Sequence, residues 1–262
     1  MACIVYSSAE PISNSLGERV VRLLDAKETG MLGGLRHFRG SGVDILRLER
    51  LPIYEEGLDS LVKTDLFVFL SRHRSSKGVA SFTVHPLGNW APSAEAGGKP
   101  RMLSMAAPWQ MRNMLVQMSK TNDTGISVTY EATHHGPLLE TPSFFVEVGG
   151  SEEIAERHYD VLARSVSEYF ASKHENVGRV AIAIGGTHYP EKFTRLALEG
   201  KYAFSHIMPR HSCTYSDMLK MGIEQSSPKA ECAVIDWKGI AAPEREVALG
   251  RLTELGIDHV RV

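Results

Sequence analysis

The sequence predicts an α/β fold of the three-layer α/β/α type, built on a mixed sheet. Short apolar runs alternate with segments of helical periodicity along most of the 262 residues. The run at 65–70 is almost continuously apolar, as in strands buried on both faces of a sheet. The strands expected at 79–85 and within 126–148 lie close together in sequence, which favours a mixed sheet. The length suits one large α/β domain or two small ones, and without a clear linker we expect a single domain over 1–262.

The first half of the chain begins with a buried strand at 3–6. Pro11 to Asn14 is expected to form a turn, with Ser13 or Asn14 capping a helix that runs to Leu24. The glycine-rich stretch at 30–42 predicts a loop, either solvated or touching substrate. Further strands are expected at 43–48, 65–70 and 81–85.

The second half contains a clear helix at 108–120, where methionine and leucine recur at helical spacing. Ser151 is expected to cap a helix that runs to about Lys173, because two glutamates follow it in the first turn. The other expected helices are 191–198 and 243–255. The expected strands are 126–130, 144–148, 179–184, 232–235 and 259–262.

Composition excludes several classes of protein. The formal net charge is −2, so nucleic-acid binding would need a local basic patch. The three cysteines form no CxxC pair, which argues for a reducing compartment and against a cysteine zinc site. No signal peptide and no membrane-spanning run is found, and we therefore expect a cytoplasmic protein without a membrane partner.

Histidines gather at the expected ends of strands. The sequence has eleven histidines, a high number for this length. Seven of them flank Gly, Pro, Ser or Thr where a strand meets a loop: His73, His85, His134, His135, His188, His206 and His211. A single histidine in such a place is usually structural, but open α/β folds put their chemistry at strand ends. As a group, these residues indicate a site.

Two kinds of chemistry suit this group, and the spacing does not decide between them. Several imidazoles with Glu131, Glu147 or Asp236 could bind zinc and generate hydroxide near neutral pH. Alternatively, one histidine acts as a general base on water and a neighbour stabilises the oxyanion. Nucleophilic catalysis is a poor alternative, because no GxSxG motif is present.

A basic cluster follows the strand at 65–70. Arg72, His73, Arg74 and Lys77 would contact phosphate groups or simply form a solvated loop. Gly186 and Thr187, after the strand at 179–184, would offer backbone N–H groups to a phosphate or an oxyanion, or form a tight turn.

Six segments in order resemble the archaeal and plant type of D-aminoacyl-tRNA deacylase, which is unrelated to the bacterial D-tyrosyl-tRNA deacylase. They are Ser71-Arg72-His73, Thr83-Val84-His85-Pro86 with Gly88-Asn89-Trp90, Thr133-His134-His135-Gly136-Pro137, Glu147-Val148-Gly149-Gly150, Gly185-Gly186-Thr187-His188-Tyr189 and His206-Ile207-Met208-Pro209. The resemblance implies a fold similar to peptidyl-tRNA hydrolase and the phosphorylase/hydrolase group. It also implies zinc and hydrolysis of the ester between a D-amino acid and tRNA, with no obligatory protein partner.

Residue roles follow as expectations from these matching segments. The expected catalytic residues are His73, His134, His135 and Glu147. The expected zinc ligands are His85, His134 and His188. The expected substrate contacts are Arg72, Arg74, Lys77, Gly186 and Thr187, with Arg36 and Arg39 helping to hold acceptor-stem phosphates.

Other activities remain open at this stage. A metal-dependent hydrolase of a small amide or nucleoside would turn over without RNA. A tRNA-binding protein without chemistry would need the basic cluster but has no use for so many histidines. The substrates of such an enzyme could also include aldehyde-modified aminoacyl-tRNA.

Overall fold

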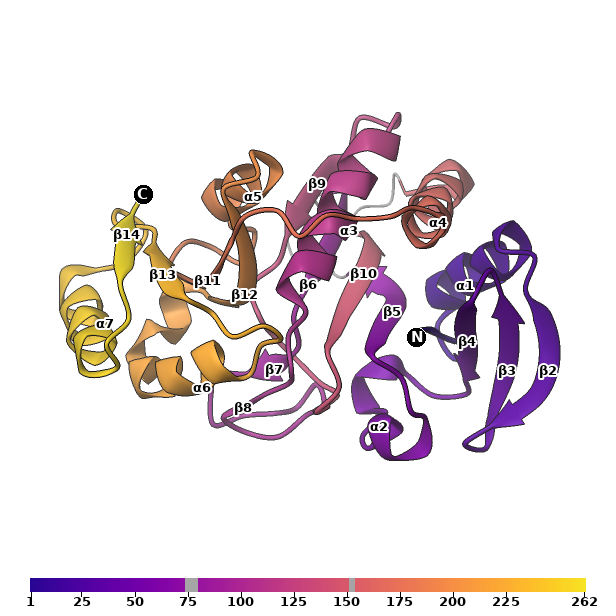
Figure 1. Cartoon of the computed structure of the whole chain (residues 1–262), viewed down its shortest axis with the longest axis horizontal. Helices are drawn as coiled ribbons and strands as arrows, with labels where there is room; N and C mark the ends of the chain where they lie inside the picture. Colours follow the sequence, from indigo (N-terminus) through magenta and orange to yellow (C-terminus); the bar gives the residue numbers. More distant parts are fainter. Residues whose placement is uncertain (74–79, 151–153) are drawn as a thin grey trace.

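The chain is built on two main sheets (Figure 1). The computed structural model describes residues 1–73, 80–150 and 154–262. An eight-stranded sheet has the order β2-β3-β4-β1-β5-β10-β6-β9, and a four-stranded sheet has the order β12-β11-β13-β14. Figure 1 shows the four-stranded sheet, in orange and yellow, lying beside the larger one. The expected α/β class with a mixed sheet flanked by helices is therefore confirmed.

The first sheet is mixed, because three of its strand pairs are antiparallel and the others are parallel. Its strands are β1 (Ala2–Ser7), β2 (Lys27–Leu32), β3 (Leu35–Gly40), β4 (Val43–Leu48), β5 (Leu66–His73), β6 (Ser81–His85), β9 (Ser127–Tyr130) and β10 (Ser143–Gly149). Strand β6 runs antiparallel to β10 and parallel to β9, whereas β5 runs parallel to β10. In this register, His73 of β5, His85 of β6 and Glu147 of β10 project from the same face of the sheet. A separate two-stranded ribbon is formed by β7 (Gly88–Asn89) and β8 (Met102–Leu103).

The second sheet is entirely parallel. Its strands are β11 (Arg179–Ile184), β12 (Tyr202–Met208), β13 (Cys232–Ile235) and β14 (His259–Arg261). Alternate residues of β11 face two different cores: Ala181 and Ala183 pack in the core shared with the first sheet, while Ile182 and Ile184 pack in a second core. The shared core fixes the two sheets against each other.

Helices cover both sheets. One face of the first sheet is covered by α1 (Pro11–Leu23), α3 (Pro108–Thr121) and α4 (Glu156–Ala171). Its other face is lined by Phe67, Phe69 and Phe145, and α2 (Leu58–Leu61) packs there after the short η1 (Pro52–Tyr54). The second sheet is accompanied by α5 (Glu191–Leu198), η2 (Arg210–Met218), α6 (Leu219–Glu224) and α7 (Ala242–Glu254).

The loop predicted at 30–42 is wrong, because these residues form most of the β2–β3 hairpin and its connection to β4. Strands β2 and β3 are joined by Gly33 and Gly34, which have φ angles of +57° and +81°. A two-residue hairpin turn with positive φ at both positions favours glycine. The glycines therefore mark a tight turn instead of a loop.

Two predicted helix starts are also wrong. Helix α1 begins at Pro11 instead of after a turn, and Glu10 caps it by accepting a hydrogen bond from the Ser13 N–H. Helix α4 begins at Glu156, and residue 151, the expected cap, lies outside the described residues. Strand β12 was not predicted. Among the described residues, no helix combines the length and apolar character needed to cross a membrane.

Candidate active site

Two glutamates are buried next to each other at the junction of the two sheets. Glu131 directly follows β9, and Glu147 lies in β10; their side chains are 0% and 5% exposed. A buried carboxylate is costly unless it is paired with a positive or hydrogen-bonding group. The neighbouring strands provide such groups, because β5 ends at His73 and β6 ends at His85.

His73 lies between the two carboxylates. Its Nδ1 atom is 3.1 Å from Glu131 Oε1 and 3.8 Å from Glu147 Oε2. Burial alone would lower the pKa of His73, but the two carboxylates outweigh burial and raise this pKa to about 9. At neutral pH His73 is therefore an imidazolium, and its Nε2–H donates to the Tyr189 hydroxyl over 2.8 Å. Tyr189 comes from the loop after β11, so this contact also joins the two sheets.

His188 forms a second pair with Glu131. The distance from His188 Nε2 to Glu131 Oε2 is 2.7 Å. Burial would raise the pKa of Glu131, but hydrogen bonds from His188 and His73 outweigh burial and hold this pKa well below its usual range. An ionised carboxylate can only accept, so His188 Nε2 carries a proton. In the neutral ring, Nδ1 is then the basic atom, and the His188 side chain is 36% exposed.

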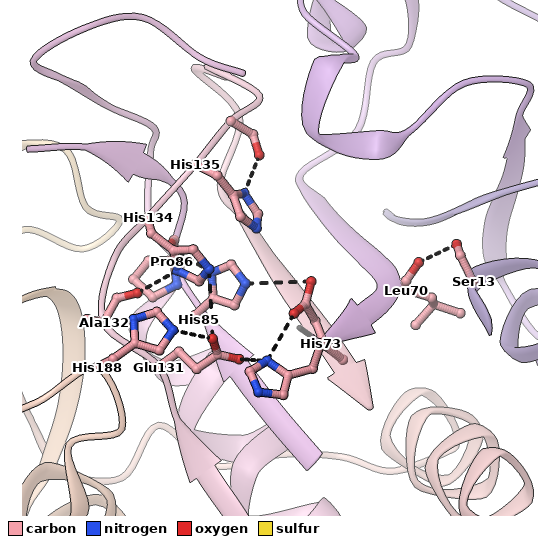
Figure 2. A network of polar contacts seen from close by, with 12 residues as sticks. Ser13, Leu70, His73, His85, Pro86, Glu131, Ala132, His134, His135 and His188 are labelled. Carbon is pink, nitrogen blue, oxygen red and sulfur yellow. Dashed lines mark hydrogen bonds and ion pairs between the residues drawn. The ribbon is translucent and has the colours of Figure 1, made fainter. Parts of the chain in front are cut away.

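Three further histidines share one pattern of hydrogen bonding (Figure 2). The Nδ1 atom of His85 lies 3.1 Å from Pro86 O, that of His134 lies 2.8 Å from Ala132 O, and that of His135 lies 2.7 Å from Gly136 O. A carbonyl oxygen can only accept, so each Nδ1 carries the proton. In the neutral ring of each histidine, Nε2 is then the atom with the lone pair. For His85, burial would lower the pKa, but the Glu147 carboxylate 3.8 Å from Nε2 outweighs burial and raises this pKa.

The four imidazole rings of His85, His134, His135 and His188 lie close together. Ring centroids are 4.2 Å apart for His85 and His134, 4.3 Å for His134 and His135, and 4.8 Å for His134 and His188. Burial lowers the pKa of His135 to about 4, and burial together with the neighbouring His85 lowers the pKa of His134 well below its usual value. Both rings are neutral at physiological pH, as metal ligands or general bases must be.

The side chains of His85, His134 and His135 could together hold a metal ion. The possible ligand atoms lie within 4.8 Å of one another. His85 Nε2 is buried without a hydrogen-bond partner among the described residues, and it lies 3.8 Å from the Glu147 carboxylate. Zinc binds neutral imidazole nitrogens, and the opposite ring nitrogen then usually donates to a carbonyl or carboxylate. Two other groups, Glu131/His134/His188 and His73/Glu131/Glu147, also bring possible ligand atoms within the same distance.

A buried threonine holds the His134–His135 segment against the second sheet. Thr133 N–H donates to Ile207 O over 2.9 Å, and Ile207 N–H donates to Thr133 Oγ1 over 2.9 Å. His206 Nε2 faces the carbonyl oxygens of residues 104 and 225, so its Nδ1, 3.2 Å from Thr133 Oγ1, is the acceptor. Burial lowers the pKa of His206 to about 4, which keeps the ring neutral. The segment carrying two site histidines is thus fixed to β12.

The structure brings together all four residues predicted to be catalytic: His73, His134, His135 and Glu147. The predicted ligands His85, His134 and His188 are also neighbours, but they do not form one donor group. His188 shares a group with His134 and Glu131, whereas His85 shares one with His134 and His135.

The predicted substrate contacts are more dispersed. Arg72 is exposed, and alternation along β5 directs it away from the face occupied by His73, toward Tyr159 of α4. Arg74 and Lys77 lie outside the described residues. Gly186 and Thr187 lie at the end of β11 and line a pocket of about 270 Å³.

The sequence did not predict the roles of Glu131, of Tyr189 or of the Thr133–His206 pair. Glu131 was one of three possible zinc carboxylates but was not among the expected catalytic residues. Its position, directly after a strand and just before the His134–His135 segment, was the available signal. Thr133, Tyr189 and His206 stood in the matching segments, but their partners come from the other sheet and could not be predicted. Asp236, another of the three carboxylates, instead accepts a hydrogen bond from Lys192.

A mixed α/β fold that gathers buried carboxylates and histidines at strand ends is typical of hydrolytic enzymes. A family model described as D-aminoacyl-tRNA deacylase matches residues 61–260. The chain is 33% identical to the D-aminoacyl-tRNA deacylase of Thermococcus kodakarensis and 35% identical to that of Pyrococcus horikoshii, with 100% of each chain covered. The chain belongs to the D-aminoacyl-tRNA deacylase family. A crystal structure titled as a conserved protein of unknown function has the same fold, with a TM-score of 0.90 at 24% identity, over 100% of this chain and 95% of that one.

Proposed function

We propose that this protein hydrolyses the ester bond that joins a D-amino acid to the terminal ribose of tRNA. Its membership of the deacylase family and the names of its relatives support this activity. The observation that carries the proposal is the Glu131–His188 pair, which lies beside three histidines whose Nδ1 atoms face carbonyl oxygens. Such a centre can remove a proton from water next to a polarised carbonyl group.

His188 is the general base in this proposal. Glu131 fixes the ring with Nε2 protonated, so Nδ1 accepts a proton from water as the water oxygen bonds to the ester carbon. The bond between this carbon and the ribose oxygen then breaks, and the proton passes from His188 to the ribose oxygen. The products are a free D-amino acid and tRNA. His188 thus acts as an acid–base histidine that is oriented by the buried carboxylate of Glu131.

His73 and Glu147 act as positioning residues. Both side chains are almost fully buried, at 1% and 5% exposed, which supports a role in positioning Glu131 and His85 instead of direct contact with substrate. The positive charge on His73 keeps Glu131 ionised, and ionised Glu131 keeps His188 in the useful tautomer. Glu147 balances the positive charge of His73, and its carboxylate also lies 3.8 Å from His85 Nε2.

His85, His134 and His135 would hold a zinc ion through their Nε2 atoms. When bound, zinc would act as a Lewis acid on the carbonyl oxygen or lower the pKa of water. The buried, unpartnered His85 Nε2 beside the Glu147 carboxylate supports this assignment, because the position favours a positive charge. We infer the cytoplasm as the compartment, because aminoacyl-tRNA is used there and all three cysteines are free thiols.

The test compares deacylation of D-Tyr-tRNA and L-Tyr-tRNA by the wild type and by His188→Gln. We expect the wild type to release D-tyrosine in preference, and His188→Gln to lower kcat by about 100-fold or more, because the base is lost. His174→Gln is the matched control, because His174 contacts only the end of α4 and should behave as the wild type. Full activity of His188→Gln would remove His188 from the mechanism. Turnover of a small amide or nucleoside, with none of D-Tyr-tRNA, would replace the proposed function.

A further inference from the structure

One edge of the second sheet carries arginines without acidic partners. The four strands run parallel, so their carboxyl ends meet at a single edge, where open α/β sheets bind ligands. Arg210 follows β12, Arg261 ends β14, and α7 contributes Arg245 from its first turns. In the described parts of the chain, none of these three arginines lies at ion-pair distance from a carboxylate. Their charges remain available to an anionic partner.

Two of these arginines enclose a tryptophan. Trp237 directly follows the Asp236 residue at the end of β13, and its ring centroid lies 4.2 Å from Arg245 Cζ and 3.9 Å from Arg261 Cζ. Arg245 Nη1 also donates to Trp237 O over 2.8 Å, which fixes its guanidinium in place. Arg261 is exposed, and Trp237 is partly exposed. Guanidinium groups stacked on an aromatic ring are well suited to RNA, because they present N–H donors to phosphates and flat faces to bases.

A pocket that includes Arg210 adjoins the candidate active site. It has a volume of about 270 Å³ and is lined by Gly186, Thr187, Tyr189, Lys192 and Arg210, among others. The loop from Gly186 to Tyr189 also carries His188, so the pocket and the proposed general base share a wall. Among the described residues that line the pocket, Lys192 is paired with Asp236 at 2.5 Å. Arg210, which lines the same pocket as Glu191, has no carboxylate at ion-pair distance among the residues that the structure describes.

Two arginines that were expected to help hold tRNA phosphates, Arg36 and Arg39, lie at the other end of the molecule. Arg36 pairs with Glu28, and Arg39 lies 3.7 Å from Asp44. Both arginines lie in β3, which is separated from β5 by two strands of the first sheet. Their charges are largely balanced, and they are remote from the histidines.

We propose that the carboxyl edge of the second sheet binds the 3′-terminal part of tRNA. This inference rests on the proposed function. With the terminal ribose at His188, the rest of the last nucleotide fits the adjoining pocket beside Arg210. Arg245, Trp237 and Arg261 then contact the phosphates and bases of the preceding nucleotides. Since these contacts are mostly to the backbone, they would serve tRNAs of any sequence.

The experiment measures binding of uncharged tRNA, and of an RNA hairpin ending in CCA, by fluorescence anisotropy at several salt concentrations. Arg210→Gln and Arg261→Gln should each raise Kd about three- to tenfold. Each should also reduce the slope of log Kd against log salt concentration by about 1, because one phosphate contact is lost. Arg261→Lys, which keeps the charge, should recover much of the affinity. Arg39→Gln is the matched control from the first sheet and should bind as the wild type. Thermal unfolding of each variant checks that the fold is intact.

Each outcome bears on this inference. Unchanged Kd for Arg210→Gln and Arg261→Gln, while the wild type still hydrolyses D-Tyr-tRNA, would overturn the binding surface and leave the function standing. If only Arg39→Gln bound RNA more weakly, the tRNA-binding surface would lie on the first sheet, and the inference would be wrong. Failure of the wild type to hydrolyse D-Tyr-tRNA would overturn the proposed function itself, and with it this inference.

Discussion

Glu131 accepts a hydrogen bond from His188 and forms an ion pair with His73, so the protonation of both histidines depends on its charge. It lies 2.7 Å from His188 Nε2 and 3.1 Å from His73 Nδ1. The carboxylate fixes the tautomer of His188 and the protonation of His73 at the same time.

Glu131→Gln is expected to lower kcat for D-aminoacyl-tRNA about 100-fold with a smaller effect on KM. The amide keeps the shape but loses the charge, and its NH₂ group can direct the wrong tautomer of His188. Single-turnover kinetics would separate the chemical step from binding. Glu140→Gln, at an exposed carboxylate, is the control. Retention of wild-type kcat by Glu131→Gln would mean that His188 is not oriented by this residue.

His73 should make stability dependent on pH. Its pKa is about 9 in the folded protein against an ordinary value of 6.5. Its stabilising contribution of roughly 3 kcal/mol is therefore complete below pH 6.5 and is lost as the pH rises to about 9. Urea unfolding of the wild type and His73→Gln at pH 6.5 and 9.5 checks this prediction. The difference in the free energy of unfolding should narrow at the higher pH, and a constant difference would contradict it.

At the scale of elements, the loop with His134 and His135 depends on its attachment to β12. Thr133→Val removes the hydroxyl that donates to His206 Nδ1 and accepts from Ile207 N–H. Two buried polar groups then lose their partner, which should cost about 2–4 kcal/mol of unfolding free energy. Thr133→Ser keeps the hydroxyl and should cost less than half as much. Equal losses in the two variants, measured by urea unfolding, would show that packing of the methyl group matters instead.

Elements with strong local patterns were predictable from the sequence. The methionine repeat predicted α3, and the apolar runs predicted β5, β10, β11 and β13, with ends correct to within about three residues. The β2–β3 hairpin was missed because Gly33 and Gly34 resemble a loop unless the strand pairing is known. Strand β12 was missed because its small and polar residues, Ser205 and His206, interrupt the apolar run. Both errors arise where distant pairing decides the structure.

At the scale of the whole molecule, the site exists only because two sheets meet. Residues following β9 and β11 supply Glu131 and His188, and β5 supplies His73, which reaches Tyr189 across the junction. The sequence could indicate which histidines end strands, and these residues do gather. It could not indicate which of them share a donor group, because that depends on how the second sheet docks on the first.

Zinc binding distinguishes the two possible ligand sets. The predicted set of His85, His134 and His188 would bridge the sheets, whereas His85, His134 and His135 all belong to the first sheet and its loops. Zinc added at about 100 times its Kd to metal-free protein should stabilise the fold by about 2.7 kcal/mol. The melting temperature should then rise by roughly 5–10 °C. We expect His135→Ala to lose this rise and one equivalent of bound zinc, and His211→Ala, the control, to keep both. If His188→Ala loses the metal and His135→Ala retains it, the ion bridges the sheets and the set predicted from the sequence is the right one.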